Sequence, residues 1–138
     1  ANGKPMGNLR SSEELGIPAW KGTLLRMGDK KQRIASFAAR GEYKVQDEKI
    51  ADTLKDLANY ACLASVLFNE VYSEESLHHN YDIEKVRDSF HFLAMKAIYC
   101  MALSECDPLD SELVDWRQEP LHELFFHFDT IAAFARKH

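Results

Sequence analysis

The sequence predicts an all-α protein, a bundle of four to five helices. Apolar residues recur at intervals of three and four along four long segments, which is the spacing of one face of a helix. No segment alternates apolar and polar residues between turn signals, as a half-buried strand would. The links between the segments are short, which favours antiparallel neighbours. We therefore expect a single all-α domain over residues 1–138.

Residues 1–17 are predicted to form an N-terminal loop. They are rich in Gly, Asn, Ser and Pro, which favour turns over long regular elements. A short helical turn over residues 11–15 can form and end at Gly16. The loop is a candidate functional segment, because an ordered loop of this length commonly closes over something.

Residues 18–72 are predicted to form a helix pair. The first helix begins at Pro18 and runs to about Arg40, and Gly41 ends it. The second has Asp47 as its N-cap and runs to about Tyr72. Its apolar face consists of Ile50, Leu54, Leu57, Ala58, Ala61, Ala64 and Phe68. Because this helix becomes apolar nearly all round towards its end, we expect it at the centre of the bundle, with its polar stripe facing an enclosed space.

Residues 73–138 are predicted to complete the bundle. A polar link leads to a third helix, which begins at Asp82 and ends near Ser104. Pro108 breaks the chain, and residues 109–117 can form a short helix. Pro120 then opens the last helix.

The charge of the chain is divided between its two ends. The net charge is −5, with nine Lys and Arg against four Asp and Glu in residues 1–46, and eight against eighteen in residues 47–138. An acidic chain is poorly suited to wrap duplex DNA, so we exclude duplex nucleic acid as a partner. A small phosphorylated ligand between the basic and acidic segments would suit this division, and mutual attraction of the two segments would explain it equally well.

No apolar run is long enough to cross a bilayer, and no signal peptide is visible, so we expect a cytoplasmic protein without a membrane partner. The cysteines Cys62, Cys100 and Cys106 form no CxxC pair, so we expect buried, reduced thiols.

The histidines do not match a known metal motif. His122 and His127 are five residues apart, whereas the zinc-protease motif needs a spacing of four on one helix face. His91 lies beside an apolar stripe and is expected to be half-buried. Neither GxxxxGK nor GxGxxG occurs, so a phosphate-binding glycine loop of either kind is absent from the sequence.

The polar face of the second predicted helix is the strongest candidate site. Glu48, Asp52 and Asp56 follow one another at intervals of four, with Asn59 beside them. A solvated face is the commoner reading of such a stripe. Like charges at this spacing repel, however, and carboxylates in an enclosed space need a cation or a basic partner. Such carboxylates could share a divalent cation that takes oxygen ligands.

Residues 5–8, 16–22, 26–33 and 47–60 together resemble a phage and bacterial family, the nucleotide-modification-associated domain. That family is similar to the all-α nucleoside triphosphate pyrophosphohydrolases, the MazG-like and dimeric dUTPase-like enzymes. The resemblance covers about residues 5–68, and its most specific part is Asp-Thr-Leu-x-Asp-Leu-Ala-Asn-Tyr at residues 52–60. It implies a MazG-like helical bundle with residues 18–72 as the nucleotide- and metal-binding helix pair.

The resemblance implies Mg²⁺-dependent hydrolysis of (deoxy)nucleoside triphosphates to monophosphate and pyrophosphate. Glu48 and Asp52 match the second acidic motif of such enzymes, and Asp56 extends it. Asp29 stands where one acidic residue of the first motif would fall, but Arg26 occupies the place of the expected Glu. A homo-oligomer, a dimer or larger, is also implied.

Eleven residues have an expected role. The expected metal ligands are Asp29, Glu48, Asp52 and Asp56, of which Glu48 and Asp56 are also the catalytic candidates. The expected substrate contacts are Lys21, Lys30, Lys31, Arg33, Asn59, Tyr60 and Trp20, although core packing is the commoner use of a tryptophan such as Trp20. The alternative is a non-catalytic bundle that binds a nucleotide or another protein, and a purely structural helical protein is a third possibility.

Overall fold

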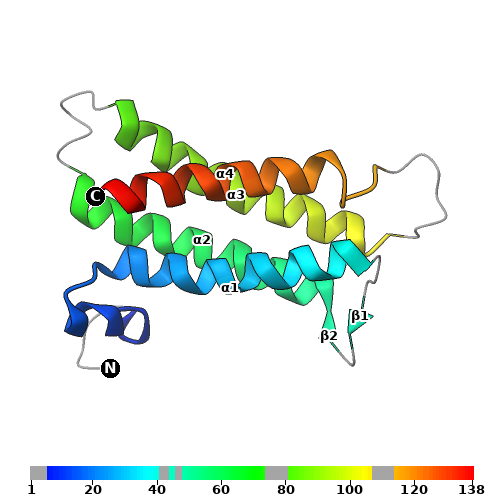
Figure 1. The fold of residues 1–138 in the computed structure, drawn as a ribbon, viewed down its shortest axis with the longest axis horizontal. Helices are drawn as coiled ribbons and strands as arrows, with labels where there is room; N and C mark the ends of the chain where they lie inside the picture. The colour runs from blue at the N-terminus through cyan, green and yellow to red at the C-terminus, as the bar shows by residue number, and fades with distance from the viewer. Residues whose placement is uncertain (1–5, 41–43, 46–47, 74–80, 107–113) are drawn as a thin grey trace.

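The computed structural model describes residues 6–40, 44–45, 48–73, 81–106 and 114–138. Four long helices dominate these residues: α1 (Ala19–Arg40), α2 (Ile50–Tyr72), α3 (Tyr81–Ser104) and α4 (Glu119–Lys137). They lie along one common direction and alternate in sense, so that the start of α1 and the end of α4 lie at the same end of the bundle (Figure 1). The predicted all-α class is confirmed, and the bounds of the four helices lie within a few residues of those predicted.

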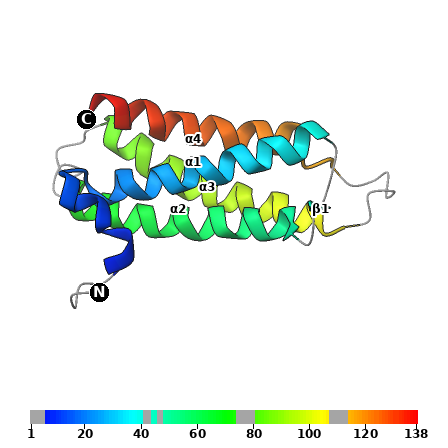
Figure 2. The same ribbon diagram turned by 60° about the horizontal axis from the view of Figure 1, so that its bottom comes forward.

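The four helices pack mainly with their neighbours in the chain. Helix α2 packs extensively against both α1 and α3, and α3 packs against α4. Helices α1 and α4 run side by side, but their backbones approach each other closely at only a few places (Figure 2). Of the interfaces between neighbouring helices, the seam between α1 and α4 is therefore the least closely packed.

The buried face of α2 agrees with the sequence pattern. All seven residues of the predicted apolar face are at most 5% exposed, which confirms the central position of this helix. Around Phe68 the core is aromatic: ring centroids lie 5.1 Å away in Trp20, 5.5 Å in Phe90 and 5.8 Å in Phe134. Because these rings come from α1, α3 and α4, this cluster joins all four helices.

The N-terminal segment packs on one end of the bundle. It forms two short 3₁₀ helices, η1 (Gly7–Leu9) and η2 (Ser11–Leu15), and η2 ends at Gly16 in the left-handed region with φ of 76°. That residue and that turn are the ones predicted. Leu9 is buried, and the Arg10 guanidinium donates two hydrogen bonds of 2.8 and 3.0 Å to the Glu70 carboxylate of α2. The loop therefore closes over the α1–α2 end of the bundle.

Helix α2 begins later than predicted. Two short strands, β1 (Lys44–Val45) and β2 (Glu48–Lys49), pair antiparallel ahead of it, and Lys49 is the N-cap in an extended conformation. The prediction of Asp47 as the N-cap is thus wrong, because Glu48 and Lys49 are extended in β2 and α2 begins only after them. Two-residue strands are too short to show an alternating pattern in the sequence.

The predicted short helix at residues 109–117 lies partly outside the described residues. Its described part is not helical: Val114 and Asp115 are irregular, and a turn over residues 116–118 leads into α4. Trp116 in this turn is buried. Among the described residues, no helix has the length and apolar character needed to cross a membrane.

Candidate functional site

The acidic stripe of α2 lies on the outside of the bundle. Asp52, Asp56 and Asn59 are all exposed. The expectation that they face an enclosed space is wrong for the single chain, because α1 and α3 cover the flanks of α2 and leave its outer face to solvent. Tyr60 is half-buried and packs against the core. The backbone of Glu48 belongs to β2, and its side chain is outside what the structure describes.

One of the predicted acid–base partnerships forms. The Lys30 ammonium of α1 lies 3.2 Å from a carboxylate oxygen of Asp56 on α2, with the two side chains 23% and 51% exposed. Asp52, about one turn earlier on the same face, makes no ion pair with any described residue. The outer face between α1 and α2 therefore includes the carboxylates of Asp52 and Asp56 and the ammonium of Lys30. An ion pair this exposed contributes only about 0–1 kcal/mol to stability, so its chemistry matters more than its strength.

Asp29 does not join these carboxylates. It is exposed and borders a groove between α1 and α4, where Gly28 and Phe128 are its neighbours in the lining. Within the described ranges, no three Asp, Glu, His or Cys side chains lie together in a group that could hold a metal ion. Asp29 lies apart from Asp52 and Asp56 because of the helix period. Lys30 points to α2, and the side chain of Asp29, one residue earlier, is turned by about 100° from that of Lys30.

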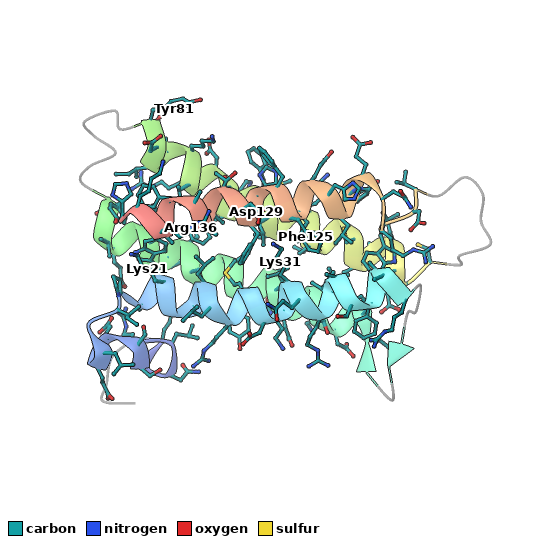
Figure 3. The ribbon with its side chains drawn as sticks, in the orientation of Figure 1. Lys21, Lys31, Tyr81, Phe125, Asp129 and Arg136 are labelled. Carbon is teal, nitrogen blue, oxygen red and sulfur yellow. The ribbon has the colours of Figure 1, made fainter. Side chains whose placement is uncertain are left out.

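The side chain of Lys31 points to α4, away from the acidic stripe. Its ammonium lies 3.1 Å from a carboxylate oxygen of Asp129. It also lies over two aromatic rings of α4, 4.8 Å from the centroid of Phe128 and 5.2 Å from that of Phe125 (Figure 3). Lys31 thus fastens α1 to α4 across the loose seam.

The other cations that were expected to contact phosphate lie at separate places on α1. Lys21 borders the groove between α1 and α4. Arg33 is exposed and lines a separate depression on α1 with Asp29 and Ser36. Among the described side chains, Lys30 pairs with a carboxylate of the acidic stripe, whereas Lys21 and Lys31 lie on the α4 side of α1. The cations therefore do not all converge on one point.

Trp20 is part of the core. Its side chain is 1% exposed and contacts the rings of Phe68, Tyr72 and Phe134. The prediction that it stacks on a nucleotide base is wrong, and its alternative use in core packing is confirmed. The indole Nε1 is buried and has no hydrogen-bond partner among the described residues.

The histidines and cysteines differ partly from expectation. His91 is exposed on the outside of α3, not half-buried. His127 of α4 is partly buried, 5.5 Å from the ring of Phe92 by centroids, and burial lowers its pKa. Cys100 is fully buried, which raises the pKa of its thiol to about 12. Cys62 and Cys106 are free but exposed: Cys62 lies on the outer side of α2, and Cys106 follows the end of α3.

Two surface features were missed in the sequence. The first is the groove between α1 and α4, whose small lining residues Gly28, Ala132 and Ala135 were the available signal. The second is the outer face of α3, where four large apolar side chains are 42–53% exposed: Phe92, Met95, Ile98 and Tyr99. The sequence pattern did not reveal them, because α3 is apolar on more than one side and its exposed face cannot be told from its buried one.

Comparison with known proteins gives no match from which a function could be inferred. No protein-family model matches this chain, and neither a curated protein nor a solved structure matches it. The fold and the stripe define a class: a four-helix bundle whose central helix carries exposed carboxylates beside a lysine of the next helix.

Proposed function

We propose that this protein is a Mg²⁺-dependent hydrolase of (deoxy)nucleoside triphosphates that releases monophosphate and pyrophosphate. The observation that carries the proposal is the exposed pair Asp52 and Asp56 on α2, with Lys30 of α1 at 3.2 Å from Asp56. Carboxylates for a metal and a cation for phosphate thus lie on one accessible face. The sequence resemblance at residues 47–60 supports the same chemistry.

The donor set fits Mg²⁺, and Mn²⁺ would bind in the same way. Mg²⁺ is commonly held by one or two carboxylates together with substrate phosphates and water, so a cage of three or four protein ligands is not required. Asp52 is exposed and without an ion-pair partner among the described residues, and it is the first ligand of the proposal. Glu48, which precedes α2, is the second. The metal supplies neutralisation of phosphate charge and a more acidic water.

The protein residues then have distinct tasks in the proposed reaction. The oxygen of a water molecule bonds to the α-phosphorus, and the bond from that phosphorus to the bridging oxygen breaks, so that pyrophosphate leaves. Asp56 accepts the water proton as general base. Lys30 exchanges its contact with Asp56 for one with the phosphates, which frees the carboxylate for this role. Asn59 and Tyr60, next along the same face, border the sugar or base.

The experiment is pyrophosphate release from a panel of deoxynucleoside triphosphates, with and without Mg²⁺. We expect Asp52→Asn to lower kcat/KM by about 100-fold or more, since a ligand to the metal is lost. Asp88→Asn is the matched control, because Asp88 is also an exposed aspartate but lies on α3. Equal activity of the Asp52→Asn variant and the unmodified protein would contradict the proposal.

A non-catalytic nucleotide-binding bundle is the second candidate. Two observations favour it. Asp56, the proposed general base, is in an ion pair with Lys30, and Asp29 borders the groove between α1 and α4 instead of joining Asp52 and Asp56. In that case Mg²⁺ with nucleotide raises the thermal midpoint, as any ligand of the native state must, but no pyrophosphate forms. A midpoint that does not move leaves a structural protein as the explanation.

The proposal includes a homodimer. The support for it is the outer face of α3, since exposed apolar patches commonly mark contact surfaces. Light scattering should then give about twice the chain mass of 15.8 kDa. Replacing Met95 by Glu should return the mass to that of one chain, whereas Glu84→Gln on the same helix should not.

A further inference from the structure

The groove between α1 and α4 is a second candidate site, on the other side of α1 from Lys30. It has a volume of about 550 Å³, within the range of small-molecule sites of about 300–1,000 Å³. Small residues of both helices line it, and Lys31 spans the two helices through its contact with Asp129. The Cβ of an alanine at Gly28 would lie 3.6 Å from the Phe128 ring, so the groove narrows at this point.

The charges of the groove are unevenly distributed. Lys21 of α1 and Arg136 of α4 lie towards one end of the bundle, on facing helices (Figure 3). In the part of the chain that the structure describes, neither has a carboxylate within ion-pair distance. Asp29 borders the groove further along α1. Between them the lining is apolar: Leu24, Leu25, Phe128, Ala132 and Ala135.

We propose that this groove binds a small organic anion with a ring-sized apolar body. The body lies on the apolar lining, and the anionic group lies between Lys21 and Arg136, which have no carboxylate of a described residue within ion-pair distance. Asp29 sets the orientation, because a negative group at its end of the groove would be repelled. The site is independent of the hydrolase proposal, since it uses neither Asp52 nor Asp56.

The test compares two fluorescent probes that differ in charge. Anilinonaphthalene sulfonate has an apolar ring body and one anionic group, and N-phenylnaphthylamine is its neutral analogue. We expect the sulfonate to bind at one molecule per chain. The double variant Lys21→Gln/Arg136→Gln should weaken the sulfonate by about tenfold or more, because charge-assisted contacts are lost, and change the neutral probe by less than about twofold. Lys55→Gln, an exposed cation of α2, is the control.

The second arm of the test fills the groove. Gly28→Leu and, separately, Ala132→Leu should weaken both probes by about tenfold, while Ala102→Leu on the outside of α3 should change neither. The unfolding midpoint of each variant shows whether it is folded. Because one filling variant lies on α1 and the other on α4, the test still works if one of the two does not fold.

Four results would overturn the proposal. The first is that Lys55→Gln weakens sulfonate binding as much as the double variant does, and the second is that neither filling variant changes the affinity of either probe. The third is binding that does not saturate at one probe per chain, and the fourth is loss of dimer mass in the filling variants, which would mean that a second copy occupies the groove.

Discussion

At the scale of single residues, two glycines of α1 have different surroundings. A Cβ at Gly22 would overlap the side chain of Ser12, whereas a Cβ at Gly28 would lie 3.6 Å from the nearest described atom, which belongs to the Phe128 ring. The absence of a side chain at Gly22 is thus what lets η2 lie on α1.

We expect opposite effects of alanine at these two positions. Gly28→Ala should raise the free energy of unfolding by about 0.5–1 kcal/mol, because alanine favours the helix and restricts the unfolded chain. Gly22→Ala should lower it by about 1–3 kcal/mol, because η2 must move. Urea unfolding measures both, and the same sign for the two variants would contradict the packing of η2.

The buried thiol of Cys100 predicts a loss of stability in alkali. Burial raises its pKa from 9.0 to about 12, so above pH 9.0 the unfolded chain loses a proton that the folded chain keeps. The free energy of unfolding should therefore fall by about 1 kcal/mol over the first pH unit above 9.0. Other groups also titrate there, so the measurement is the difference from Cys100→Ala, in which this contribution is absent. Cys62→Ala, at an exposed thiol, should keep the full slope.

At the scale of elements, the joint between α1 and α4 depends on Lys31. Its ammonium contacts both the Asp129 carboxylate, which is 67% exposed, and the Phe128 ring at 4.8 Å. An ion pair to so exposed a group is screened by water, whereas a ring offers attraction and apolar contact. The aromatic contact should therefore be the stronger of the two.

Double-mutant cycles separate these contributions. We expect a coupling free energy below about 0.5 kcal/mol for Lys31 with Asp129, and of about 0.5–1 kcal/mol for Lys31 with Phe128, each from alanine variants. Added salt should reduce the first coupling and leave the second nearly unchanged. A larger coupling to Asp129 would show that the joint is mainly electrostatic.

At the scale of the whole molecule, the packing order predicts where the bundle opens first. Helix α2 is packed on both flanks, whereas η1 and η2 cover one end and are held through Arg10 and Glu70. In hydrogen exchange we expect residues 57–67 to exchange only on global unfolding, and residues 8–16 to exchange faster. Glu70→Ala should speed exchange in residues 8–16 alone. Glu14→Ala, an exposed residue within η2, is the control, and faster exchange in the middle of α2 would contradict the order.

The candidate site was predictable only in part. The spacing of Asp52 and Asp56 placed them on one face of a helix, and the structure agrees with that. Their exposure was not predictable, because it depends on which flanks of α2 the neighbouring helices cover. For the same reason Trp20 was assigned both to a site and to the core, and only the packing around Phe68 decided between them.

The sequence by itself determined the local features of this protein: the four helices, the turn that ends at Gly16 and the buried face of α2. These depend on apolar period and on turn residues, which are properties of neighbours in the chain. Only the tertiary structure decided that Lys30 contacts α2 while Lys31 contacts α4, and that a groove lies between α1 and α4. One step along a helix turns a side chain by about 100°, and what it then meets, such as Asp129 for Lys31, comes from a distant part of the chain.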